Sequence, residues 1–127
     1  MKDFIRMLEL VHYGSVDAVP KLAHLLVSVR LAVAVEKLPA PGERARVLIV
    51  REPDGRSLFP IFSGEDTLRR WDSRTQWGTF PALVIFETAV SGPFDALVFN
   101  PAGPNRMEIR RDVLLTLVGI ARSTPRN

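Results

Sequence analysis

The sequence predicts a small α/β domain of the α+β type, in which helices cover a small mixed or antiparallel sheet that contains a β-hairpin. First, the chain has 127 residues, of which 46% are hydrophobic and 24% charged, as in one globular domain. Second, segments with helical hydrophobic spacing are followed by short runs typical of strands. Third, the turn sequence EPDG separates two of these runs. We expect a single domain over residues 1–122 and a frayed tail at 123–127.

Two helices are expected at the amino-terminal end. Apolar residues recur at helical spacing from Lys2 to Tyr13, which predicts the first helix. Charged residues interrupt this segment, so it lacks the continuous apolar core of a signal peptide. The second helix is expected to have Pro20 in its first turn, Ser15 or Asp17 as its cap, and its end near Ser28.

A strand and a hairpin follow these helices. Hydrophobicity alternates with a period of two over Val29–Val35, which predicts a strand covered on one face. The run VLIV at 47–50 is apolar on both faces and predicts a central strand. The chain should turn at Pro53-Asp54-Gly55 and return along Ser57–Phe62. Pro60 has no N–H to donate, so it marks an edge, a bulge or the exit of this return strand.

A short helix is expected directly after the hairpin. Ser63 can cap it by accepting a hydrogen bond from the N–H of Glu65 or Asp66. Leu68 and Trp71 are three residues apart and would hold the helix against the core. We expect Trp71 to be substantially buried, because it is the largest apolar side chain of so short an element.

The second half of the chain holds further short elements, which we expect as strands at 76–79, 95–99 and 106–109 and a helix at 111–122. Between the first two strands, residues 81–91 are apolar throughout, so periodicity fits either a strand or a buried helix. Pro81 at the start and Gly92 at the end favour the helix.

Two short motifs resemble those of a known family. The first is Pro60-Ile61-Phe62-Ser63 with Leu68 and Trp71, and the second is Asn100-Pro101-Ala102-Gly103. Their order among the expected elements is similar to that of the amino-terminal domain of the SseB family, named for enhanced serine sensitivity, over nearly the whole chain. The resemblance implies an α/β domain without an established catalytic mechanism and a bacterial, cytoplasmic source. It carries over no catalytic residue.

Charge and composition argue against several classes of partner. The net charge is +3 and the 17 basic residues are spread along the chain, so we expect no nucleic acid. The most apolar segment, Leu22–Val35, contains His24 and Arg30 and is shorter than the roughly 20 residues that span a bilayer, so we expect no membrane partner. The chain has no cysteine, which fits a reducing compartment, and the cytoplasm is the expected location.

The sequence predicts no catalytic, metal-binding or cofactor-binding residue. His12 and His24 lie on separate expected helices, and neither has a second metal ligand at helical spacing. No glycine-rich phosphate-binding motif occurs, and no serine lies in a nucleophile elbow. Glu65 and Asp66 diverge around their helix, which suits a helix start better than a shared proton. We therefore expect a protein that is not an enzyme and needs no cofactor.

The candidate binding residues are Phe59, Asn100, Pro101 and Arg106. Asn100 follows a buried strand, where α/β domains often bind ligands, and the alternative is that it begins an Asx turn that Pro101 rigidifies. Arg106 is close enough in sequence to clamp an anion. Phe59 adds apolar contact area if it points outward, whereas an inward Phe59 belongs to the core and leaves the loop alone as the candidate.

The function that we expect from these features is a non-catalytic protein-interaction or regulatory module of SseB type, whose partner is another protein. Two other functions stay open. One is a small-ligand binding domain for an amino acid or an anion, which would use Asn100 and Arg106. The other is an uncharacterised hydrolase, which would need a histidine beside a serine.

Overall fold

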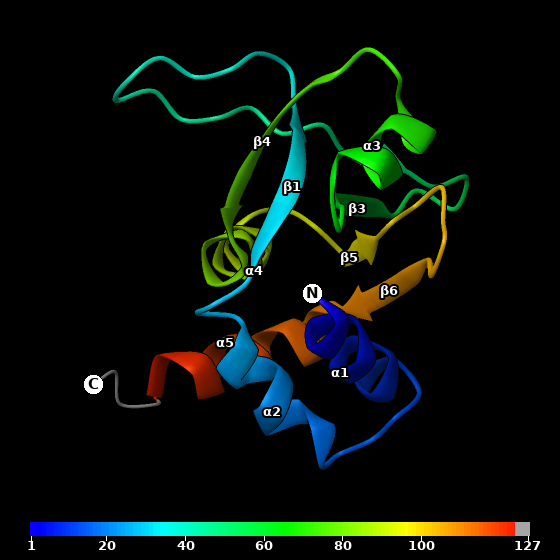
Figure 1. Ribbon diagram of the computed structural model, residues 1–127, viewed down its shortest axis with the longest axis vertical. Coiled ribbons are helices and arrows are strands. Elements are labelled where there is room, and N and C mark those ends of the chain that lie inside the picture. Colours follow the sequence, from blue (N-terminus) through cyan, green and yellow to red (C-terminus); the bar gives the residue numbers. More distant parts are fainter. Residues whose placement is uncertain (124–127) are drawn as a thin grey trace.

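The computed structural model describes residues 1–123 and confirms an α+β domain. In chain order its elements are α1 (Lys2–His12), α2 (Ala18–Leu25), β1 (Arg30–Val35), β2 (Val50–Arg51), β3 (Ser57–Ile61), α3 (Glu65–Trp71), β4 (Gln76–Pro81), α4 (Ala82–Ser91), β5 (Ala96–Phe99), β6 (Met107–Arg110) and α5 (Arg111–Ser123). Helices α1, α2 and α5 gather at one end of the molecule, and β1, β4 and α3 lie at the other (Figure 1). The main core lies between these two parts.

The strands form two small sheets. Strands β1 and β4 pair antiparallel as a two-stranded sheet. The other sheet has the order β2-β3-β5-β6, in which β3 and β5 are parallel and the outer pairs are antiparallel. The expected mixed sheet is therefore present, and the connection from β3 to β5 passes through α3, β4 and α4.

Strand β3 joins the two sheets along one of its edges. Its residue Leu58 pairs with β2, and Phe62, directly after the strand, exchanges two backbone hydrogen bonds of 3.0 Å with Ala32 of β1. The backbone of Pro60 faces the same edge, between these two partners, because alternate residues of a strand turn their backbone groups to opposite sides. Its missing N–H therefore removes no bond to β5. Of the three expected roles, Pro60 has that of an edge position.

The hairpin is confirmed at its turn, but its first strand is not central. The Glu52 N–H donates to the carbonyl of Arg56, and the Gly55 N–H donates to that of Glu52, both at 2.9 Å. Gly55 has a φ of +91°, which glycine adopts without strain. The expectation of a central strand over 47–50 was wrong, because β2 is the outer strand of its sheet and Ile49 is 38% exposed.

Strand β1 is covered on both faces, which corrects the expectation of one covered face. Leu31 and Val33 belong to the main core. On the opposite face Ala32 and Ala34 are also buried, against Phe62 and Leu68. Two alanines leave room for α3 to lie close to the strand, so a face that reads as weakly apolar in sequence is fully covered.

Helix α3 begins differently from the expectation. Its N-cap residue is Gly64, and the expected side-chain cap by Ser63 is absent. Thr67 lies one turn into the helix, and its Oγ1 accepts a hydrogen bond from the Gly64 N–H at 3.4 Å. Leu68 is fully buried, whereas Trp71 is partly buried with its ring 5.5 Å from that of Phe62. Leu68 is therefore the main anchor and Trp71 the second one.

The apolar segment after Pro81 is a helix, as its flanking residues indicated. Helix α4 follows β4 directly and buries Leu83, Phe86 and Ala89. Arg111, at the start of α5, donates through its guanidinium to the carbonyls of Ala89, Val90 and Gly92. Carbonyl groups at a helix end lack partners within the helix, so this arginine completes the hydrogen bonding of α4 and ties it to α5.

The carboxyl-terminal helix extends slightly further than expected. Helix α5 ends at Ser123, one residue beyond the expected end of the domain. The rest of the expected tail, residues 124–127, lies outside the described residues. Within residues 1–123, every helix is too short or too polar to cross a lipid bilayer.

Candidate functional site

The loop after β5 is held together by the side chain of Asn100. Asn100 is 1% exposed and has a φ of +47°. Its Oδ1 accepts a hydrogen bond from the Ser63 N–H at 3.0 Å, and its Nδ2 donates to Ser63 Oγ at 3.3 Å and to the Pro104 carbonyl at 3.1 Å. The amide thus ties the loop to the β3–α3 junction rather than forming the expected Asx turn. Both of its N–H donors are occupied within the protein.

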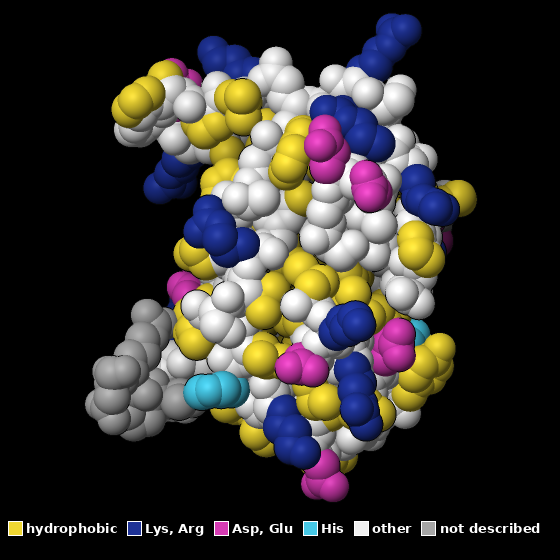
Figure 2. All heavy atoms as spheres, viewed as in Figure 1, with side chains coloured by type: hydrophobic (Ala, Val, Ile, Leu, Met, Phe, Trp, Pro, Cys, Tyr) yellow, Lys and Arg dark blue, Asp and Glu magenta, His cyan; other side chains and the backbone are white. Residues whose placement is uncertain are grey.

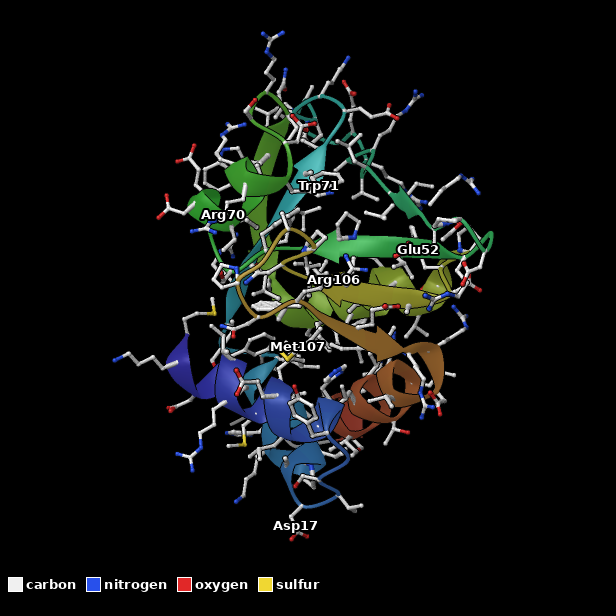
Figure 3. All side chains as sticks on the ribbon, turned by 90° about the vertical axis from the view of Figure 1, so that its right-hand side faces the viewer. Asp17, Glu52, Arg70, Trp71, Arg106 and Met107 are labelled. Atoms are coloured by element: carbon white, nitrogen blue, oxygen red, sulfur yellow. The ribbon has the colours of Figure 1, made fainter. Side chains whose placement is uncertain are left out.

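Arg106 is also engaged by the protein itself. Its guanidinium donates to the carbonyl of Pro101 at 3.1 Å and to Glu52 Oε1 at 3.0 Å, and Glu108 Oε2 lies 3.8 Å away. Figure 3 shows Arg106 and Glu52 on the same side of the molecule. The side chain of Arg106 is 41% exposed, so it remains a surface group. Its charge is already balanced by these two carboxylates, which weakens its expected role as an anion clamp.

Phe59 points inward and belongs to the core. It is 1% exposed, and its ring meets that of Phe94 edge-on with centroids 5.0 Å apart. The expected outward contact surface at Phe59 is therefore absent. Phe59 does contribute to a concave surface, because it lies at the bottom of a groove beside α4.

The groove has a volume of about 760 Å³. One wall is the outward face of α4, and the other is formed by β1, β4 and the segment that precedes β2. Most of its lining is apolar: Val33, Ala45, Val47, Phe59, Phe80, Val84, Ile85 and Phe94. The charged lining residues are Arg44, Glu87 and Arg122.

Local sequence explains both walls of the groove. Val84, Thr88 and Ser91 follow one another at helical spacing, so α4 turns one stripe of side chains towards the groove. Gly92 then allows Phe94 to fold back over the end of α4. A Cβ at Gly92 would lie 2.6 Å from the Phe94 ring, which is far too close. The signal for this site in the sequence was an apolar helix flanked by Phe80 and Phe94, and the residues expected to bind did not include it.

The polar groups of the groove differ in how well they are paired. The hydroxyls of Thr88 and Ser91 donate to the α4 carbonyls of Val84 and Glu87, both at 2.8 Å. The Glu87 carboxylate accepts from Arg122, with Oε2 2.9 Å from Nη2. Arg44 makes no side-chain hydrogen bond or ion pair within residues 1–123. It is thus the free cation on the rim.

A second cavity, of about 590 Å³, bears on the hydrolase alternative because His12 and Ser15 both line it. The Nδ1 atom of His12 lies 3.1 Å from the backbone carbonyl of Glu108, in a contact with β6. No hydrogen bond joins His12 to Ser15 in the described part of the chain. Residues 1–123 also contain no group of three side chains placed to hold a metal ion.

Charge on the surface is mixed. On the face shown in Figure 2, Lys and Arg side chains are scattered among acidic and apolar ones rather than gathered in one patch. At the hairpin turn, hydrogen bonds from Arg56 hold the pKa of Asp54 below its ordinary value. The backbone N–H of Arg56 is the larger cause and its guanidinium the second. The same guanidinium also binds Glu108 at 2.9 Å, so these charges serve contacts within the protein.

A family model matches most of the chain. The family model described as SseB protein N-terminal domain matches residues 8–115. No curated protein and no solved structure matches the chain. The match begins within α1 and ends within α5, and it includes both motifs that suggested the resemblance.

Proposed function

The chain belongs to the family of SseB protein N-terminal domains. On that premise we propose that it is a non-catalytic module that binds another protein. The observation that carries this proposal is the apolar groove beside α4. It replaces the loop at Asn100 as the candidate binding surface, because the side chains of that loop are occupied by the protein itself. The resemblance and the absence of cysteine both support a bacterial cytoplasmic setting.

The shape and exposure of the groove support protein binding. Val84, the first residue of the α4 stripe, is 50% exposed, and Phe80 and Phe94 are only partly buried. Contiguous exposed apolar surface with a polar rim is typical of protein interaction sites and ligand-binding grooves. A partner that covered the groove would remove these side chains from water, which is the main favourable term in association.

A small ligand is the second candidate, and the volume of the groove favours it. Small-molecule sites commonly enclose about 300–1,000 Å³ of mostly apolar space with a few polar groups. The volume of about 760 Å³ and Arg44, which has no side-chain partner within residues 1–123, fit that description. The proposal that the protein is not an enzyme is supported by His12, because the contact of its ring is with a backbone carbonyl rather than with a serine.

A pair of matched variants tests the proposed function. Val84→Glu places a charge in the groove, and Leu115→Glu places one on α5, at a residue that is 51% exposed against 50% for Val84. Proteins that copurify with wild type from the native host should be lost with Val84→Glu and kept with Leu115→Glu. Thermal unfolding of both variants should match wild type, because exposed substitutions usually change stability by less than about 0.5 kcal/mol.

Two outcomes contradict this function. If Val84→Glu retains the same partners as wild type, the groove is not the binding surface. If wild type turns over an ester, peptide or phosphate, and His12→Ala or Ser15→Ala removes that turnover without unfolding the protein, the molecule is an enzyme.

A further inference from the structure

We propose that the partner segment which fills the groove is acidic as well as apolar, with a carboxylate bound by Arg44 and apolar side chains on Phe80 and Phe94. This inference rests on the proposed function and specifies the chemistry of the partner at the same groove. Three features of the lining support it: its exposed aromatic rings, its one free cation, and the surface that continues beyond that cation.

The apolar part of the segment follows from the floor of the groove. Phe59 and Ile85 are buried at 1% and 3% exposure, so the base of the groove is already packed. Phe80 and Phe94 cover this base and remain partly exposed. Val84 adds apolar surface from α4. Because these side chains are adjacent and face water, the occupant that gains most from the groove presents apolar side chains to all three.

The acidic part follows from the balance of polar groups. Thr88 and Ser91 donate their hydroxyl hydrogens to their own helix, so they offer no donor to a ligand. The only carboxylate of the lining, on Glu87, is bound by Arg122 at 2.9 Å. Arg44 therefore supplies the unbalanced charge among the lining residues. Its planar guanidinium suits a carboxylate, which it can bind through two parallel hydrogen bonds.

The surface beyond Arg44 favours a polypeptide over a small ligand. Arg44 also lines a neighbouring cavity of about 200 Å³, whose other walls carry Glu36, Lys37, Glu43 and Arg46. The concave surface thus passes from an apolar centre, past Arg44, to a rim of mixed charge. Protein interfaces have this arrangement, with an apolar core and a polar rim, and a chain can extend across both parts.

Selection of peptides tests this chemistry without knowledge of the natural partner. Phage-displayed random peptides are selected on the full chain in four forms: wild type, Val84→Glu, Arg44→Glu and Arg46→Glu. Arg46 is the matched control, because it lies two residues from Arg44 and lines the small cavity but not the groove. Circular dichroism and thermal unfolding establish that each variant is folded.

The expected result is a reversal of charge preference. Wild type and Arg46→Glu should select peptides that combine apolar residues with Asp or Glu, and Arg44→Glu should select Lys or Arg in their place. A synthetic peptide selected by wild type should bind Arg44→Glu at least about tenfold more weakly, and a version with its acids replaced by lysine should regain that affinity.

Other results separate this inference from the proposed function. If the selected peptides no longer bind Val84→Glu, but show no charge preference and bind Arg44→Glu as well as wild type, the proposal of an acidic partner is wrong. The groove then remains a protein-binding site. If no peptide responds to Val84→Glu, both proposals fail. If no peptide binds wild type, but laurate binds wild type and does not bind Val84→Glu, the occupant of the groove is a small apolar acid. That result also overturns both proposals.

Discussion

The loop at residues 100–106 and the groove beside α4 differ in whether their polar and apolar groups already have partners within the protein. In the loop, the amide of Asn100 is hydrogen-bonded to Ser63 and Pro104. The guanidinium of Arg106 is hydrogen-bonded to Pro101 and Glu52. In the groove, Phe80 and Phe94 remain partly exposed and Arg44 is unpaired within the described residues. The loop has many polar groups, and these are hydrogen-bonded within the protein. The groove has few polar groups, but one of them, the guanidinium of Arg44, has no partner among the described residues.

This difference teaches that the polarity of a loop is a weak guide to binding. A buried amide such as Asn100 has to be hydrogen-bonded by the protein, because an unpaired buried amide is costly. The more deeply such a side chain lies, the less it can offer to a ligand. Surface apolar groups follow the opposite logic, since the protein cannot satisfy them without covering them.

The largest expected effect is that of Phe59→Ala, which tests whether the floor of the groove belongs to the core. Truncation of a buried phenylalanine removes its packing and leaves a cavity, so we expect a loss of about 3–5 kcal/mol in urea unfolding. The control Tyr13→Ala removes a ring that is 83% exposed and should change stability by less than about 0.5 kcal/mol. A loss below about 1 kcal/mol for Phe59→Ala would place that ring outside the core.

Asn100→Gly tests whether the loop is structural. Glycine keeps the positive φ but removes the buried amide, so the partly buried groups on Ser63 and Pro104 lose their hydrogen bonds. We expect a loss of about 1–3 kcal/mol in free energy of unfolding. Asn105→Gly is the control, because Asn105 also has a positive φ, of +64°, but is exposed. Equal effects of the two variants would remove the contrast between the occupied loop and the open groove.

Arg106→Ala should have a smaller effect than Asn100→Gly. Its ion pair with Glu52 is 3.0 Å long but partly exposed, and exposed ion pairs contribute about 0–1 kcal/mol. Chemical denaturation in low and high salt measures this contribution, and salt should reduce it. A loss that exceeds that of Asn100→Gly would show that the arginine, rather than the amide, holds the loop.

The smallest effect concerns the hairpin turn, where Arg56→Ala should raise the pKa of Asp54 only in part. The largest cause of the lowered pKa is the Arg56 backbone N–H, which alanine retains, and the guanidinium is the second cause. NMR titration should find the carboxyl pKa higher than in wild type but still below its ordinary value. Since the folded pKa is lowered, the contribution to stability is present above the unfolded pKa and lost as pH falls through the folded one. A pKa unchanged by the substitution would exclude the guanidinium as a cause.

Most helices and the hairpin turn were predictable because they depend on local signals. Helical spacing identified α1 and α5, and the turn sequence at residues 52–55 placed the hairpin. The failed expectations depend on neighbours that are distant in sequence. VLIV is apolar enough for a central strand, but among the described residues β2 is the outer strand of its sheet, and residues 47–48 pair instead with the end of β1. Ser63 has the chemistry of a cap, but its hydroxyl lies beside Asn100, which is far away along the chain.

The same limit applied to the candidate site. The sequence identified Asn100 and Arg106 by residue type and by their position after a strand, and both do lie in one loop region of the fold. It could not show that the protein already occupies them. The groove combines Arg44, Phe80 and Phe94 from three separate segments, so no single stretch of sequence contains it. Only Val84, an outward valine in an apolar helix, gave a local sign.

The way β3 joins the two sheets has a consequence for the chain as it leaves the ribosome. Strand β1 is synthesised early, and one of its edges finds partners at residues 46–48 and at Phe62. Its other edge pairs with β4, so that edge of apolar residues stays open in a nascent chain until Pro81 has emerged. Open edges of this kind recruit other strands. The interval of synthesis between Val35 and Pro81 is thus the period in which this edge of β1 lacks its partner strand.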